Sequence, residues 1–97
     1  MNALFSSGAN DDVKRILEYY ASEAGTDVAM DFHSELIALL ARIKEWPESF
    51  QLTDNDLRRG LMQRFPFQVI FRIQSADRVR ILAVRHHKRH PDFGLDR

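Results

Sequence analysis

The fold is decided by the stretch FQVIFRIQSADRVRILAV, residues 67–84. In each half of it, apolar side chains recur at every second position, which is the period of a β-strand. The three residues between the halves, Ser75-Ala76-Asp77, are few enough to form a hairpin turn. Each strand also carries apolar residues on its second face, which favours a central place in a sheet. We therefore predict two antiparallel central strands, Phe67–Gln74 and Val79–Val84.

Two weaker strand signals lie outside this stretch, one just before it and one at the N-terminus. Leu57–Arg64 predicts a third strand, in which Gly60 is a candidate for a β-bulge. The segment before it, Glu48–Asp56, is polar and rich in turn-forming residues. At the N-terminus the short apolar run Ala3-Leu4-Phe5 predicts an edge strand.

Two helices are predicted between these strands, because the apolar period there is 3.6. The first runs from about residue 9 to Ala24, with Ser6, Ser7 and Asn10 as candidate N-caps and two aspartates suited to its first turn. Gly25 suits the position after its last turn, and Thr26 or Asp27 can cap the second helix. The second helix carries one apolar stripe and ends at Trp46-Pro47. The stripe consists of Phe32, Leu36, Leu39, Leu40 and Ile43.

Together these elements predict one α+β domain over residues 1–97, since a chain of 97 residues leaves room for only one. We expect the N-terminal strand and the two-helix hairpin to pack on one face of a small, mainly antiparallel sheet of three to four strands. The aromatic residues Phe65, Phe67 and Phe71 then belong to the core. Arginine and histidine are expected on the opposite face, which is the expected working surface.

Charge is strongly segregated along a chain whose formal net charge is zero. Residues 1–56 hold 11 Asp and Glu and 4 Lys and Arg, a net charge of −7, whereas residues 57–97 hold 3 and 10, a net charge of +7. One interpretation is a basic face for phosphate or for an acidic partner. The other is a set of internal ion pairs between the two parts.

Several classes of site are excluded by composition and spacing. The absence of cysteine removes disulfides, thiol nucleophiles and thiolate zinc sites. No apolar run approaches the roughly 20 residues that span a bilayer, and the N-terminus lacks the pattern of a secretory signal, so we expect a cytoplasmic protein. His86, His87 and His90 invite a metal site, but residues four apart on a strand are about 13 Å apart, which argues against one. We expect no metal and no cofactor.

The second half of the chain carries a recognisable pattern. Arg58 is followed by Phe65-Pro66-Phe67 at the opening of an alternating strand, and the last apolar strand ends in a His-x-x-Arg-x-Pro run formed by His86, Arg89 and Pro91. In this the chain resembles the RelE/ParE superfamily of type II toxin–antitoxin toxins. The resemblance covers nearly the whole chain, and its specific part begins at Arg58. It implies the same fold of two helices against an antiparallel sheet, and a cognate antitoxin as partner.

The resemblance implies one of two mechanisms. RelE-like members cut mRNA on the ribosome, with cations for the phosphorane charge and groups that transfer protons. The residues that fill those roles here would be Arg58, Arg85, His86 and Arg89. ParE-like members inhibit DNA gyrase and are not nucleases. The wider set expected to contact a target or partner is Arg58, Arg59, Arg64, Arg85, His86, Arg89, His90 and Phe93.

Two features favour the ParE-like mechanism. The C-terminal tyrosine that serves RelE-like nucleases falls near Phe93, which has no hydroxyl to exchange a proton. The His-x-x-Arg-x-Pro ending is also more typical of ParE-like chains. We therefore expect a DNA gyrase inhibitor, with a ribosome-dependent endoribonuclease or an inactive antitoxin-binding member as alternatives. The basic stretch from Arg85 to Arg97 is expected to serve toxicity and not the fold, and Arg72, Arg78 and Arg80 to be ordinary solvent charges.

Overall fold

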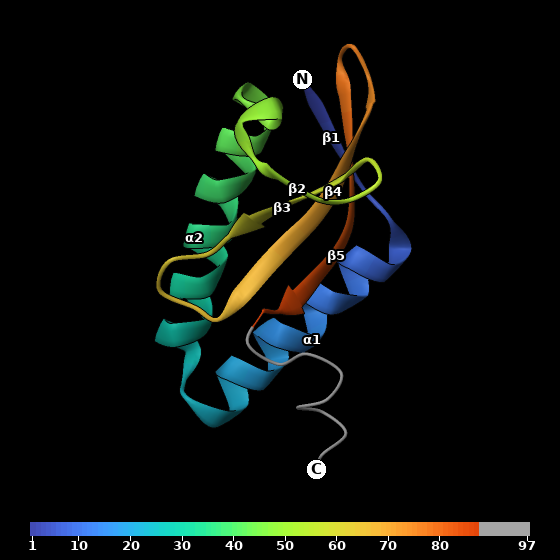
Figure 1. The fold of residues 1–97 in the computed structure, drawn as a ribbon. Coiled ribbons are helices and arrows are strands. Elements are labelled where there is room, and N and C mark those ends of the chain that lie inside the picture. Colours follow the sequence, from blue (N-terminus) through green and yellow to red (C-terminus); the bar gives the residue numbers. More distant parts are fainter. Residues whose placement is uncertain (88–97) are drawn as a thin grey trace.

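The protein is built as a five-stranded sheet with two helices on one of its faces (Figure 1). The computed structural model describes residues 1–87. Its elements are β1 (Asn2–Phe5), α1 (Ser7–Glu23), α2 (Thr26–Glu45), the short 3-10 helix η1 (Pro47–Ser49), β2 (Gln51–Asp54), β3 (Leu57–Leu61), β4 (Phe67–Ser75) and β5 (Arg78–His86). The strand order is β1-β5-β4-β3-β2, with β1 parallel to β5 and every other pair antiparallel. The predicted α+β class is confirmed.

The sheet has one more strand than the predicted range of three to four. The additional strand is β2, within the segment that reads as polar and turn-rich, and all four of its residues are exposed. Its pairing with β3 needs no apolar alternation, because backbone bonds form it and polar side chains support it. The Nε of Arg59 donates a hydrogen bond to Oε1 of Gln51 at 3.1 Å, directly across the pair.

The junction of β1 and α1 is fastened to an irregular part of β5. Helix α1 begins at Ser7, and the hydroxyl of Ser6 accepts the Ala9 N–H at 3.0 Å while donating to the Leu82 carbonyl at 3.2 Å. The register of β4 against β5 shifts here, because Ile81 and Ala83 are paired and Leu82 is passed over. Ser6 thus caps the helix and satisfies a backbone group at this bulge.

The early start of α1 also changes the place of its acidic residues. Because the helix begins two residues before the predicted position, Asp11 and Asp12 lie beyond its first turn. Asp12 instead accepts the Val84 N–H at 2.9 Å. Val84 lies on β5 past Ile81, the last residue that β1 pairs. The Asp12 carboxylate therefore occupies the edge of β5 where β1 has ended.

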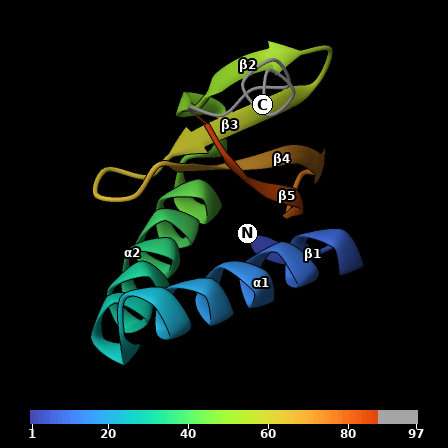
Figure 2. The same ribbon diagram turned by 90° about the horizontal axis from the view of Figure 1, so that it is seen from below.

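The two helices meet at a corner formed by Gly25 and diverge from it (Figure 2). Gly25 has a φ of 104°, a backbone conformation that other residues rarely adopt. It follows the C-cap of α1, as predicted, and is itself the N-cap of α2. The predicted cap at Thr26 or Asp27 is wrong, since no side-chain cap bond is formed and both residues already belong to the helix.

The core lies between the helices and the inner face of the sheet. Its largest fully buried side chains are Phe32, Leu39, Ile43, Val69, Phe71, Val79 and Ile81. The predicted bulge at Gly60 is wrong, because Gly60 pairs regularly with Val69. Its role is close approach: a Cβ there would lie 3.1 Å from Cδ1 of Leu39 and 3.1 Å from Cε2 of Phe50. The absence of a side chain at Gly60 lets α2 pack directly against β3.

Neither helix of the described residues is long and apolar enough to cross a bilayer.

Candidate partner-binding surfaces

The strand register divides the arginines of the sheet between its two faces. Residues directly opposite one another on paired strands project to the same side. Gly60, Val69 and Val84 form one such row on the face covered by the helices. The alternate positions therefore belong to the other face, which no described helix covers (Figure 2). We call it the open face, and its arginines are Arg59, Arg72, Arg78, Arg80 and Arg85.

Two of these arginines lie directly across from each other. Arg72 on β4 is the register partner of Arg80 on β5. Like charges in this position repel and lower the stability of a sheet. Arg72 is compensated only by Asp56, whose Oδ2 is 3.8 Å from its Nη1, and Arg80 forms no ion pair with any residue in 1–87. Both residues are predicted from the sequence to be ordinary solvent charges, and the register places them on the basic face.

Two further arginines of the open face, Arg59 and Arg85, flank Gln68 on β4. The Nη1 of Arg59 donates to Oε1 of Gln68 at 3.3 Å, and Arg85 is the register partner of Gln68 on β5. The Arg85 side chain is exposed and forms no ion pair with a described residue. Its guanidinium is thus available to an external anion.

Arg58 lies on the face opposite to Arg59. It is the register partner of the fully buried Phe71, and its Nη1 donates to the backbone carbonyls of Phe50, at 2.8 Å, and Glu48, at 3.3 Å. These bonds tie η1 and the start of β2 to β3. Within the described residues, Arg58 therefore has a structural role: it holds the segment that links α2 to β2 against β3.

His86 also lies on the helix side of the sheet, which corrects the expectation that histidine and arginine share the opposite face. It is the register partner of Phe67, and the two rings meet edge to face with centroids 5.3 Å apart. Phe67 and Phe71 are four residues apart on β4, a distance of about 13 Å along the strand. Because Arg58 pairs with Phe71 and Arg85 projects from the open face, Arg58, Arg85 and His86 do not converge on one point.

Arg64 belongs to the loop between β3 and β4, which α2 holds by two carboxylates. The carboxylate of Glu35 accepts the backbone N–H of Gln63, and that of Arg64 at 3.1 Å. The Arg64 guanidinium pairs with Oδ2 of Asp31 at 3.1 Å and lies 5.8 Å from the ring centroid of Phe65. The predicted site residue Arg64 is therefore engaged with α2. Contacts across 28 or more residues leave no local signal in the sequence.

Replacing Glu35 by Ala is expected to lower the free energy of unfolding by about 1–2 kcal/mol, because the loop loses its carboxylate acceptor. Chemical denaturation checks the value. Glu45→Ala removes an exposed carboxylate from the last turn of the same helix and serves as the matched control. Equal stability of the two variants would show that the Glu35 contacts contribute nothing.

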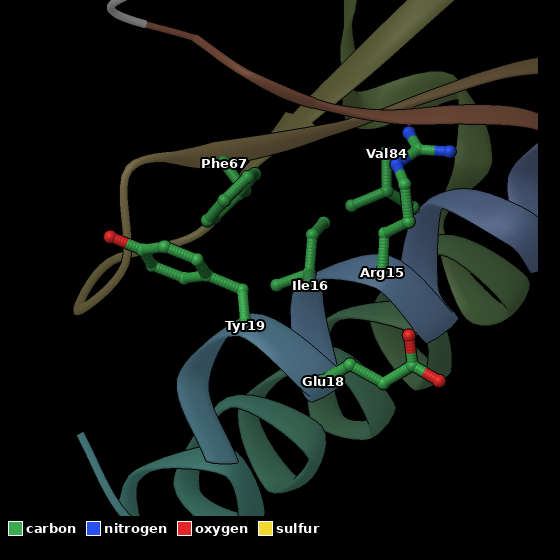
Figure 3. Close-up of a pocket in the computed structure, with 6 residues that line it drawn as sticks. All are labelled: Arg15, Ile16, Glu18, Tyr19, Phe67 and Val84. Carbon is green, nitrogen blue, oxygen red and sulfur yellow. The ribbon is translucent and has the colours of Figure 1, made fainter. Parts of the chain in front are cut away.

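An apolar hollow opens between α1, the start of β4 and the end of β5. Figure 3 shows Ile16 and Tyr19 from α1 facing Phe67 and Val84, with Arg15 at the rim. The neighbouring Tyr20 is packed against Phe67, with ring centroids 6.3 Å apart. Burial raises the pKa of the Tyr20 hydroxyl above its ordinary value, and the nearby Tyr19 raises it further. The Tyr20 hydroxyl is therefore neutral at physiological pH, and its ring is partly buried against the core.

A second apolar surface lies on the outer side of the helical pair. Met30 is 58% exposed and Ile37 is 51% exposed, although both are large hydrophobic residues on α2. They border shallow hollows between the two helices that α1 lines with Val13 and Leu17. His33 lies beside them and is exposed. We call this surface the outer groove.

Three predicted site residues, Arg89, His90 and Phe93, lie outside the described residues. Within residues 1–87, no group of three or more His, Asp or Glu side chains is placed to hold a metal ion.

Comparison with known proteins gives this arrangement a family. The model of the ParE toxin of the type II toxin–antitoxin system parDE matches residues 3–91. The chain belongs to the ParE toxin family. No curated protein sequence matches it. Among solved structures, it is similar to a chain of the chromosomal ParDE toxin–antitoxin system from P. aeruginosa, with 17% identity and a TM-score of 0.77 over 89% of this chain and 95% of that one.

Membership of the ParE family confirms the resemblance inferred from the residues between Arg58 and Pro91. This ParE-family protein is a type II toxin, and its family implies a cognate antitoxin as its partner. The similarity at 17% identity supports the shared fold of the two chains.

Proposed function

We propose that this protein inhibits growth by binding and poisoning DNA gyrase, without nuclease chemistry, and that its cognate antitoxin neutralises it in the cytoplasm. The observation that carries the proposal is the separation of the residues that an RNA-cleaving site would need. Arg58 is engaged with backbone carbonyls, His86 packs on Phe67, and Arg85 projects from the opposite face of the sheet.

An RNase of this kind needs a proton-transfer group and cations around one phosphate. Arg58 and His86 lie on strands separated by β4, beside residues four positions apart on that strand. A single phosphate does not reach both without rearrangement of the sheet. The arrangement supports a toxin that acts through a binding surface.

Neutralisation by an antitoxin is supported by two surfaces that the described residues leave unpartnered. The outer groove presents Met30 and Ile37 to solvent, which suits the apolar face of a partner helix. At the far edge of the sheet, β2 has no strand beyond it. A partner segment can add to that edge through backbone hydrogen bonds.

Two assays on the purified protein test the proposal side by side. In the first, gyrase and relaxed plasmid are incubated with the protein, and cleaved or relaxed DNA is expected to accumulate. In the second, a translating extract receives the same amount of protein, and mapping of RNA 5′ ends is expected to show no new cleavage. Addition of the antitoxin before gyrase is the control and is expected to restore supercoiling. New mRNA ends together with normal gyrase activity would overturn the proposal in favour of a ribosome-dependent endoribonuclease.

A further inference from the structure

We propose that the open face of the sheet binds an acidic segment of the cognate antitoxin, and that this segment also carries aliphatic side chains. The inference rests on the proposed neutralisation by an antitoxin and assigns part of that contact to the face opposite to the helices. Three features of the sheet support the proposal: its charge, its exposed apolar residues and the placement of its aromatic residues.

Charge is the first argument. The strands β3, β4 and β5 contain no acidic residue on either face. Five arginines project from the open face, and Arg72 and Arg80 are held directly opposite each other at a cost to stability. A carboxylate between two guanidinium groups would convert this repulsion into charge-assisted hydrogen bonds. The open face is thus arranged for an anionic partner.

Exposed aliphatic residues on the same face are the second argument. Leu61, the register partner of Gln68, is 44% exposed, and Leu4, the register partner of Arg80, is 41% exposed. Ile70 lies between them on β4 and is also outside the core cluster. A partner that buries these residues gains the hydrophobic contribution that a simple anion would not. The pattern fits a polypeptide with alternating acidic and aliphatic side chains.

The placement of aromatic residues distinguishes a polypeptide from a nucleic acid. Sheets that bind single-stranded nucleic acid stack bases on exposed aromatic rings. Here the phenylalanines of the sheet, Phe5, Phe67 and Phe71, all project to the helix side, where Phe71 is fully buried. Among the described residues of β3, β4 and β5, the open face offers arginine without a stacking platform. This combination favours carboxylates over bases.

The charge of the helical layer also directs an acidic partner to the open face. The helices α1 and α2 together hold eight Asp and Glu and four Lys and Arg, a net charge of −4. An acidic segment is repelled there and attracted to the opposite side of the molecule. A second copy of this chain, docked with its helices on the sheet, would form an asymmetric contact that propagates into open chains. We therefore assign the open face to the cognate antitoxin, the partner that membership of the ParE family implies, and not to a second copy of this chain.

A single introduced thiol tests whether the open face is covered. The chain has no native cysteine, so Leu61→Cys places one reporter on the open face and Ser22→Cys places a control on an exposed position of α1. In the purified complex with the antitoxin, we expect the alkylation rate of the first thiol to fall about tenfold or more, and that of the second to stay unchanged. Unchanged alkylation at position 61 in an intact complex would overturn the inference while leaving antitoxin binding intact.

A double variant tests whether the contact is acidic. Arg72→Gln with Arg80→Gln is expected to weaken antitoxin binding about tenfold or more at low salt, and to flatten the dependence of affinity on salt. Arg42→Gln with Lys44→Gln removes two exposed charges from α2 and is the matched control. Because the Arg72–Arg80 repulsion is relieved, the melting temperature is not expected to fall. Wild-type affinity for the antitoxin in the double variant would overturn the inference. If the wild-type chain forms no complex with the antitoxin at all, the proposed neutralisation and the inference fail together.

Discussion

Replacing Phe32 by Ala is expected to lower the free energy of unfolding by about 3–5 kcal/mol, because the change opens a cavity at the centre of the core. Phe32 on α2 is fully buried. Its ring meets those of Tyr20, Phe65 and Phe67 with centroids 5.9, 5.4 and 5.6 Å apart. The residue thus joins both helices to the loop and strand that follow β3. Urea denaturation of purified variants measures the loss.

Such a loss is a large share of the roughly 5–15 kcal/mol that stabilises a typical domain. The toxicity of Phe32→Ala is therefore expected to fall with its folded fraction. Binding of the antitoxin to the native form is expected to restore accumulation of the protein. Tyr19→Ala, at a residue 62% exposed, is the control and is expected to change stability far less. A loss below about 1 kcal/mol for Phe32→Ala would contradict the assigned core.

The paired substitution Arg85→Ala with Arg89→Ala is expected to abolish growth inhibition and to leave the melting temperature unchanged. Arg85 is exposed at the end of β5 and its side chain forms no hydrogen bond or ion pair with a described residue, so its charge contributes little to the fold. Arg89 lies outside the described residues. It is included because it belongs to the His-x-x-Arg-x-Pro run on which the resemblance rests. Colony counts after induction measure toxicity, and thermal unfolding is measured separately.

His86 is left unchanged in this experiment because its ring packs against Phe67 and its removal would disturb the core. Arg42→Ala with Arg78→Ala removes two other exposed charges and is expected to keep full toxicity. Two results would refute the prediction: full growth inhibition by the Arg85 and Arg89 variant, or a clear fall in its melting temperature.

The parts of the fold that the sequence predicts are those with a local period. The β4–β5 hairpin and α2 each bury one face along most of their length, so their alternation and their apolar stripe are visible in the residues. Strand β2 has no such signal, since its four residues are exposed. Its pairing depends on β3, which supplies the backbone partners and Arg59.

The candidate surfaces were less predictable, because they depend on register and on long-range contacts. Counting alternate positions does not reveal that Leu82 is passed over in the pairing of β4 with β5. Nor does it reveal which of two neighbouring arginines, Arg58 or Arg59, faces the helices. The Glu35 carboxylate accepts backbone N–H groups of the loop before β4, and these residues lie far from it in the chain. Local patterns therefore indicated a basic surface but not its members.

The pairing of β1 with β5 ties the order of folding to the order of synthesis. Strand β1 has no partner strand until β5 has been translated, and Ser6 donates to a carbonyl 76 residues further along the chain. Contacts of this span raise the contact order and slow folding. The native sheet cannot close on a nascent chain that lacks β5. The sheet therefore closes only after β5 has been translated, and a chain truncated before Arg78 lacks the strand that joins its first residues to the sheet.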